Sequence, residues 1–314
     1  MVQNLQVIAV NMKKINIFEN EVDVKDHLCS TNKNNCPSKC KVSLRLYIKV
    51  TDDCQCNCKF CANENLKDFG NLDLKKLDYV IRYLYENKIL HGISITGGEP
   101  MINPDKLNDV INLIYNISSD IEVAISTNGL NFKLFKEFDN VNKLESIHLS
   151  RHHYNDIINS EIFRSKNVAK TEDIMLLQEY LADKRIININ TLVMKGYIDS
   201  LKEIKNMLNY VGETGVYKNG FVSLMKCNEF AKERFINFNS IFNNLDENFF
   251  LAHHFYSKDY CECVDGVYIT NNDKLVEFYA RMVKESLCDY VNQLVYTSDN
   301  KVTAGFGGKV LLKW

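Results

Sequence analysis

Apolar residues follow two different spacings along most of the chain. Residues 44–50 alternate apolar and polar side chains, as a half-buried β-strand does, and residues 93–96 form a second, shorter strand. Between them, residues 72–90 carry apolar side chains three and four positions apart, which predicts an amphipathic helix. This part of the chain therefore predicts a strand, a helix and a strand in succession.

The alternation of helices and strands continues to about residue 225. It predicts helices at 104–116, 132–138, 171–182 and 201–210, and strands at 121–126, 146–150, 186–194 and 220–224. Alternating elements of this kind favour a parallel sheet with right-handed crossovers. We therefore predict an α/β fold, a partial (β/α)6 TIM-like barrel over residues 42–225, with its functional loops at the carboxyl ends of the strands.

The segments on either side of the barrel do not follow this pattern. Residues 1–41 form a short N-terminal segment, and residues 226–314 form a C-terminal extension that we expect to pack on the barrel. Within the extension the sequence predicts a helix at 274–291 and a hairpin that ends in 305–314. A length of 314 residues fits one large domain with such additions.

Composition and charge exclude some classes of protein. Hydrophobic residues make up 46% and charged residues 25%, as in globular proteins, and the net charge of −2 gives no general footprint for nucleic acid or an anionic membrane. The first residues lack the features of a secretory signal, and no apolar run reaches bilayer-spanning length. We therefore expect a cytoplasmic protein.

Eleven cysteines in such a protein are more naturally metal ligands or reactive thiols than a disulfide framework. The densest group follows the first barrel strand, where Cys54, Cys58 and Cys61 have the spacing C-x3-C-x2-C. Three thiolates from one loop leave one iron of a cubane cluster open for another ligand. The alternatives are a zinc site with a fourth ligand elsewhere, or reduced cysteines without a metal. Cys56 lies outside this spacing.

The cysteine loop resembles the signature of the radical S-adenosylmethionine (SAM) superfamily, including the aromatic Phe60 before the last cysteine. Three further segments of that family's type follow in order, at the ends of the second, third and fifth strands: 97–100 (Gly-Gly-Glu-Pro), 126–129 (Ser-Thr-Asn-Gly) and 193–196 (Val-Met-Lys-Gly). The resemblance covers residues 42–225. It implies a [4Fe-4S] cluster on Cys54, Cys58 and Cys61 that cleaves SAM reductively to a 5′-deoxyadenosyl radical, which abstracts a substrate hydrogen atom.

The resemblance also implies cofactor contacts. Phe60 would pack beside the cluster, and the 97–100 segment would meet the amino group of SAM, with glycines that permit a close backbone approach. Polar groups of the 126–129 segment would lie near the ribose and methionyl parts. The residues expected to bind cofactor are Phe60, Gly97, Gly98, Glu99, Pro100, Ser126, Asn128, Ser150 and Met194.

The end of the fourth strand departs from the family, because many relatives carry Ser-x-Asp where this chain has Ser150-Arg-His-His. Arg151 has the fork of donors that pairs with a carboxylate, either that of SAM or that of an anionic substrate. His152 and His153 are candidates to move protons or orient the substrate. The alternative is that one histidine is structural and the other solvated, and we expect at least one to face the cavity. His148 is expected to be buried and hydrogen-bonded.

The distal cysteines leave three interpretations open. Cys227 follows the sixth strand, and with Cys261, Cys263 and Cys288 it would ligate an auxiliary iron–sulfur cluster. Alternatively, Cys227 donates a hydrogen atom to a substrate radical, or these residues are free thiols packed as small apolar side chains. The N-terminal group has no assigned role: Cys29, Cys36 and Cys40.

We therefore predict a radical SAM enzyme whose substrate is a ribosomally made peptide or protein. A small molecule such as a nucleoside, sugar or cofactor precursor is the second hypothesis, and a non-catalytic iron–sulfur or redox-sensing module is the rival from another class. The expected partners are a reductant such as flavodoxin or ferredoxin and a precursor peptide, with no membrane and no general nucleic-acid binding.

Overall fold

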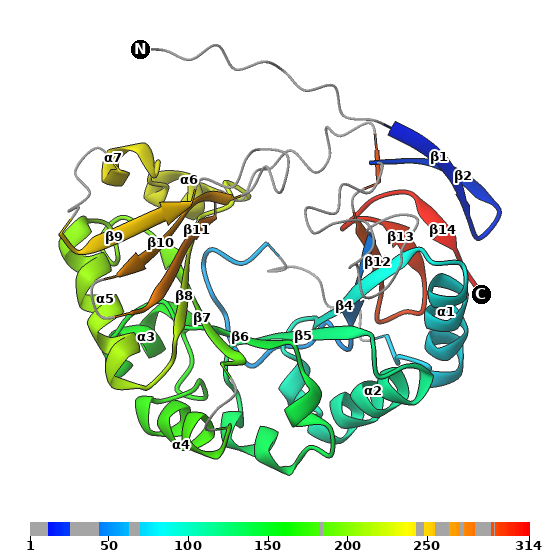
Figure 1. Cartoon of the computed structure of the whole chain (residues 1–314), viewed down its shortest axis with the longest axis horizontal. Coiled ribbons are helices and arrows are strands. Elements are labelled where there is room, and N and C mark those ends of the chain that lie inside the picture. The colour runs from blue at the N-terminus through cyan, green and yellow to red at the C-terminus, as the bar shows by residue number, and fades with distance from the viewer. Residues whose placement is uncertain are drawn as a thin grey trace.

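The computed structural model describes residues 12–25, 44–62, 70–181, 185–242, 248–254, 264–270, 273–279, 290–291 and 293–314. Six parallel strands lie next to one another in the order in which they occur along the chain. They are β3 (Leu44–Lys49), β4 (Leu90–Thr96), β5 (Glu122–Thr127), β6 (Ser146–Ser150), β7 (Ile187–Val193) and β8 (Lys218–Ser223). The curved sheet with helices on its outer side confirms the predicted partial barrel (Figure 1).

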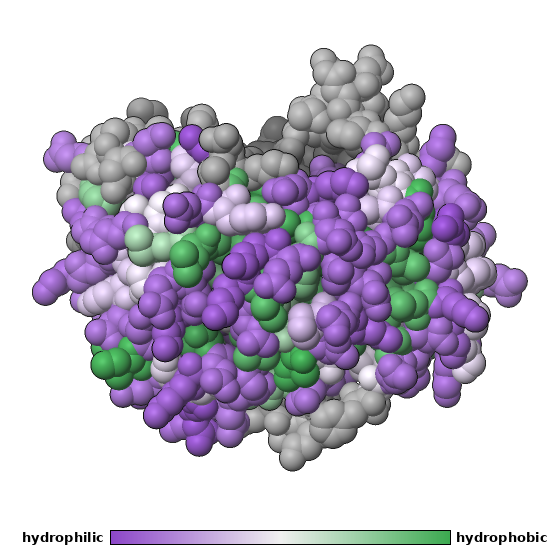
Figure 2. Space-filling model, turned by 90° about the horizontal axis from the view of Figure 1, so that it is seen from below, coloured by the Kyte–Doolittle hydropathy of each residue, from purple (hydrophilic) through white to green (hydrophobic). Residues whose placement is uncertain are grey.

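Four long helices follow barrel strands and cover the outer side of the sheet (Figure 1). In the first of them, four buried residues at helical spacing pack on the strands, and Asp73 caps its N-terminus by accepting from two backbone N–H groups. Their opposite faces are solvated, and Figure 2 shows a mostly hydrophilic outer surface with scattered hydrophobic patches. The four are α1 (Leu74–Glu86), α2 (Pro104–Ile117), α4 (Thr171–Leu181) and α5 (Leu201–Glu213).

Shorter helices complete the barrel connections. The helix predicted at 132–138 is the 3-10 helix η2 (Phe132–Glu137), and two further 3-10 helices are η1 (Pro100–Ile102) and η3 (Val141–Lys143). An additional α-helix between β6 and α4, which the sequence reasoning missed, is α3 (Asp156–Phe163). After β8 come α6 (Glu229–Arg234) and α7 (Asn239–Phe242).

The two faces of the barrel strands differ in polarity. Side chains that point to the helices are apolar and fully buried, for example Leu46, Ile95 and Ile189. Because successive side chains of a strand point to opposite faces, the intervening residues form the concave inner face. Many of these are polar, and they include Arg45, Ser94, Ser146, His148, Asn188, Asn190 and Lys218.

The C-terminal extension adds strands to both edges of the barrel sheet. At one edge β11 (Leu275–Tyr279) pairs in parallel with β8 and carries β10 (Val264–Thr270) and β9 (Phe250–His254). At the other edge β12 (Gln293–Tyr296) pairs in parallel with β3 and carries β13 (Val302–Ala304) and β14 (Val310–Leu312). The C-terminal hairpin is therefore confirmed.

The helix predicted at 274–291 is wrong over Leu275–Tyr279, which forms β11. Val276 and Phe278 are buried on one face of this strand, and residues 275, 277 and 279 occupy the other. Short apolar runs of this kind satisfy both the helical and the strand period, and pairing with β8 decides the outcome.

A hairpin precedes the barrel and was not predicted. Its strands are β1 (Met12–Ile17) and β2 (Asn20–Lys25), and it lies beside α1 and β14 (Figure 1). Phe18 at its turn stacks on Tyr83 of α1 with ring centroids 4.3 Å apart, and Asn20 donates to the carbonyl of Leu311. None of the helices in the described ranges is long and apolar enough to cross a bilayer.

Candidate active site

The loop after β3 carries four cysteines and is fixed against the last turn of α3. The backbone N–H of Asn57 donates to the carbonyl oxygen of Phe163 at 3.2 Å, and the Cys58 thiol donates to the same oxygen at 3.7 Å. Within the loop, the N–H of Cys61 donates to the carbonyl of Cys58 at 3.1 Å. Cys58 is buried and the other three thiols are half-buried: Cys54, Cys56 and Cys61.

The donor set of this loop fits an iron–sulfur cluster. The loop offers several thiols from one short segment, and thiolates are the ligands by which proteins hold iron–sulfur clusters. Phe163 and Val168 pack on Cys58 and form an apolar wall. Cys54, Cys58 and Cys61 would hold the cluster, and this assignment stays a prediction.

Two thiols of the loop, those of Cys54 and Cys56, have raised pKa values. The hydrogen bond to Cys56, followed by burial, raises the pKa of Cys54 far above its ordinary value. For Cys56, the hydrogen bond with Cys54 lowers the pKa, but the hydrogen bond with Cys58 and burial outweigh it and raise the pKa to about 12. Cluster assembly must therefore release a proton from Cys54.

The glycines after β4 permit contact with the cysteine loop itself. The N–H of Gly98 donates to the carbonyl of Thr51 at 2.7 Å, and the N–H of Glu99 donates to that of Asp53 at 2.8 Å. A Cβ atom on Gly97 would overlap the carbonyl oxygen of Thr51, and one on Gly98 would overlap that of Asp53. The glycines thus allow a close contact with the cysteine loop, whereas their predicted approach to SAM stays a prediction.

Glu99 is buried, and its carboxylate accepts three hydrogen bonds. They come from the N–H of Met101 at 3.0 Å, the hydroxyl of Thr127 at 2.6 Å and the N–H of Asn128 at 2.7 Å. Burial raises its pKa to about 7, although these hydrogen bonds act in the opposite direction. Glu99 thus joins the loop after β4 to the loop after β5, with Pro100 buried beside it at the start of η1. Its contact with the amino group of SAM stays a prediction.

Arg151 does not face an open cavity. It is 1% exposed, and its guanidinium makes four hydrogen bonds within the chain, at 2.5–3.1 Å. Three go to the backbone carbonyls of His153, Tyr154 and Ala169, and the fourth goes to the carboxylate of Asp156. This arrangement differs from that expected of an anion-binding residue, because the donors are already used to hold the loop after β6.

The two histidines after β6 are both buried. His152 lies between two rings, stacked on Phe163 at 4.8 Å and edge-on to Phe60 at 5.2 Å, so it lies beside the cysteine loop. Its Nδ1 accepts from the N–H of Leu192 at 3.2 Å. His153 Nδ1 accepts from the N–H of Asn155 at 3.0 Å, and burial lowers the pKa of this imidazole. Their proposed roles with protons or substrate remain predictions.

The remaining predicted residues lie at the same end of the barrel. Ser126 and Ser150 lie at the carboxyl ends of β5 and β6 and are half-buried. Met194, after β7, is fully buried in an apolar cluster with Leu192, against which Phe60 packs. His148 is more deeply placed on the inner face, where Nε2 lies 3.0 Å from the hydroxyl of Ser146, and Nδ1 has no hydrogen-bond partner among the residues that the structure describes. It is therefore only half satisfied, contrary to expectation, and burial lowers its pKa to about 4.

Cys227 reaches the cysteine loop from β8. Its exposed thiol donates to the carbonyl of Phe60 at 3.6 Å, and the next residue, Asn228, donates to the carbonyl of Lys59 at 2.9 Å. The other predicted auxiliary ligands and the unassigned N-terminal cysteines lie outside the described residues: Cys261, Cys263, Cys288, Cys29, Cys36 and Cys40.

Sequence reasoning missed two features that hold the cysteine loop. One is α3, whose N-cap Asn155 before an apolar run was a readable signal. The other is Gln55, whose amide contacts Asn128 and the carbonyl of Asn167. Gln55 had no signal of its own, because both partners are distant in the sequence.

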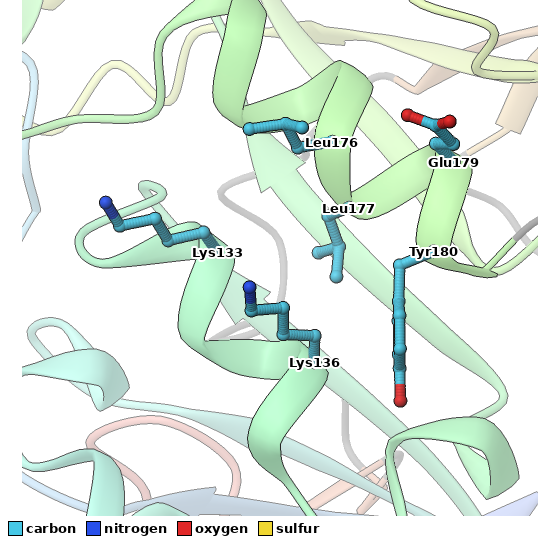
Figure 3. Close-up of a pocket in the computed structure, with 6 residues that line it drawn as sticks. All are labelled: Lys133, Lys136, Leu176, Leu177, Glu179 and Tyr180. Carbon is cyan, nitrogen blue, oxygen red and sulfur yellow. The ribbon is translucent and has the colours of Figure 1, made fainter.

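A pocket of about 280 Å³ lies elsewhere, between η2 and α4 on the outer side of the barrel (Figure 3). Leu177 forms its buried floor, and four charged or aromatic side chains and the exposed Leu176 surround it: Lys133, Lys136, Glu179 and Tyr180. It is separate from the loops at the carboxyl ends of the strands.

The model of the Radical SAM superfamily matches residues 48–211, just over half of the chain. The chain therefore belongs to the radical SAM superfamily. It is accordingly an enzyme that uses a [4Fe-4S] cluster and SAM and that needs a reductant.

Curated relatives include GTP 3′,8-cyclases. The protein of Limosilactobacillus fermentum is 27% identical over 207 residues, which cover 64% of this chain and 55% of that protein. The protein of Aquifex aeolicus is 26% identical over 181 residues, which cover 54% and 53%. The chain thus spans about half the length of these relatives.

Among solved structures, Streptococcus suis SuiB bound to S-adenosylmethionine has a TM-score of 0.59 at 15% identity. The match covers 84% of this chain and 60% of SuiB. SuiB bound to its precursor peptide SuiA matches with a TM-score of 0.57. At such identity the likeness shows the fold alone, and it confirms the partial barrel.

Proposed function

We propose that this radical SAM enzyme modifies a ribosomally made peptide or protein bound on the concave face of the barrel. The observation that carries this proposal is the charge of that face. Its three cations on the parallel strands are each paired with a carboxylate: Arg45 with Glu145 at 2.5 Å, Lys218 with Glu277 at 2.7 Å, and Lys49 with Asp52.

Paired charges and neutral polar groups suit a peptide better than a triphosphate. A triphosphate needs several cations free to bind it, and each of these three strand cations would first have to leave its carboxylate. A peptide backbone instead needs alternating donors and acceptors, which serine hydroxyls and the amides of Asn188 and Asn190 supply. SuiB, which has a similar fold, has a structure with a bound precursor peptide, and this supports a peptide as the class of substrate.

The bound cluster and SAM supply the 5′-deoxyadenosyl radical. The chain's own residues hold the reacting groups and exclude water, since a misplaced radical is quenched. Phe60, Met194 and Leu192 provide an apolar boundary next to the cysteine loop. His152 lies between Phe60 and Phe163. We propose that it is the titratable side chain nearest to the reacting groups.

The test is turnover by protein reconstituted anaerobically with iron and sulfide, reduced and supplied with SAM. Candidate precursor peptides encoded beside the gene and GTP are compared by mass spectrometry. We expect 5′-deoxyadenosine formation to rise with a peptide, together with a change in that peptide's mass. Conversion of GTP with no response to any peptide would overturn the peptide proposal.

A small-molecule substrate is the second candidate, because the sequence relatives include GTP 3′,8-cyclases. The ligand assignment is tested separately from both candidates. Replacing Cys54, Cys58 and Cys61 with Ala should abolish cluster assembly and 5′-deoxyadenosine formation, whereas Cys56→Ala, the matched control in the same loop, should retain both. Turnover by the triple variant would refute the assignment, and no turnover by the intact protein would favour a non-catalytic module.

We also propose the auxiliary cluster on Cys227, Cys261, Cys263 and Cys288. The exposed Cys227 thiol beside Phe60 supports it, because a second centre there would lie next to the first. Iron content and electron paramagnetic resonance of the reconstituted protein decide. An iron content near four per chain would exclude a second four-iron cluster.

A further inference from the structure

Two side-chain amides meet beside the cysteine loop although they are far apart in the sequence. Nε2 of Gln55 donates to Oδ1 of Asn128 at 2.8 Å, and Nδ2 of Asn128 donates to Oε1 of Gln55 at 3.3 Å. The two amides therefore form a reciprocal pair between the loop after β3 and the loop after β5.

Backbone groups fix which way each amide points. The N–H of Leu130 can only donate, and it donates to Oδ1 of Asn128 at 3.1 Å. The carbonyl of Asn167 can only accept, and it accepts from Nε2 of Gln55 at 2.7 Å. These backbone partners turn the nitrogen of the Asn128 amide towards the cysteines. They therefore settle which end of the amide is nitrogen and which is oxygen.

Nδ2 of Asn128 lies 3.6 Å from the sulfur of Cys54 and 3.4 Å from that of Cys56. The Asn128 residue is 8% exposed, so water competes little for these contacts. We infer that Asn128 is a positioning residue for the iron–sulfur cluster: its amide donates a hydrogen bond to the ligand sulfur of Cys54, and Gln55 fixes that amide. The inference rests on the family's cluster and is independent of the substrate.

A hydrogen bond to a ligand sulfur stabilises negative charge, and the reduced cluster carries one more negative charge than the oxidised cluster. Asn128 should therefore raise the reduction potential. Without its donor, the ratio of reduced to oxidised cluster at a fixed potential should fall about tenfold, which for a one-electron couple corresponds to a shift of about 59 mV to more negative values.

The experiment is a redox titration followed by electron paramagnetic resonance on anaerobically reconstituted protein without substrate. Asn128→Leu removes the donor at similar size, and Gln55→Met removes the amide that orients it. The matched control is Asn159→Ala, because Asn159 is also a buried amide but accepts from the backbone N–H of His152. We expect both test variants to shift to more negative potential, and the double variant to shift no further than Asn128→Leu.

A four-iron cluster with an unchanged potential in Asn128→Leu would overturn the inference. If that variant assembles no cluster, Gln55→Met decides by the same criterion. If both Asn128→Leu and Gln55→Met lose the cluster while Asn159→Ala retains it, the two amides are needed for cluster assembly. This result would also overturn the inference. Because no substrate is present, none of these outcomes bears on the peptide proposal.

Discussion

Replacing Arg151 by lysine should destabilise the protein rather than impair ligand binding. Lysine keeps the charge but lacks the planar fork that reaches four acceptors on different sides of the loop. It can retain one or two of them, so two or three hydrogen bonds to a charged donor are lost in a buried place. At about 1.5–3 kcal/mol each, and with partial relaxation, we expect a loss of about 3–5 kcal/mol.

For a chain of this length the loss corresponds to a fall in melting temperature of roughly 2 °C per kcal/mol. Thermal unfolding of Arg151→Lys is compared with that of Arg164→Lys, an exposed arginine at the end of α3 for which we expect little change. The Michaelis constant for SAM, measured below the transition, should not change. An unchanged melting temperature together with weaker binding of SAM or substrate would refute the structural role and restore the role that the sequence suggested.

Three other predictions concern the loops around the cysteines. Folding raises the pKa of Glu99 from 4.5 to about 7, so the protein should lose about 3 kcal/mol of stability as the pH rises from about 4.5 to about 7. Glu99→Gln should abolish this pH dependence of the free energy of unfolding, measured by denaturant titration at several pH values. The same pH dependence in both proteins would contradict the prediction. Gly98→Ala should lower iron incorporation while circular dichroism stays unchanged, because its Cβ overlaps the carbonyl of Asp53; full iron content would contradict it. Cys58→Ala should lose the cluster signal in electron paramagnetic resonance and Cys56→Ala should keep it, whereas equal losses would show that both cysteines are ligands.

The barrel could be predicted because its information is local. The strands alternate with helical segments along the chain, and neighbours in the barrel sheet are also successive strands in the sequence. The strand β11 escaped prediction for the opposite reason, since β9 and β10 lie between it and its partner β8 in the sequence, and the paired Glu277 and Gly220 are 57 positions apart. Without knowledge of that partner, the apolar residues of 274–291 fitted the period of a helix as well as that of a strand.

The site was predictable in its position but not in its contacts. Motifs at the strand ends located the cysteine loop and its neighbours correctly at one end of the barrel. Sequence could not show that Arg151 turns into the loop after β6, because direction depends on where the acceptors of residues 153–156 lie. Gln55 and Asn128 likewise acquire their meaning only when the fold joins them.

The pairing of β12 with β3 sets the order in which the protein can be completed during synthesis. The edge of β3 that faces β12 stays unpaired until β12 has left the ribosome, because Gln293 pairs with Arg45. The same C-terminal turn then brings Ser298 to Asp52, two residues before Cys54. Until then the nascent chain has an unpaired edge that is prone to aggregation. If iron binds before β12 pairs with β3, the cysteine loop still lacks the contact between Ser298 and Asp52. Deletion of β12, β13 and β14 should therefore impair both solubility and metal retention.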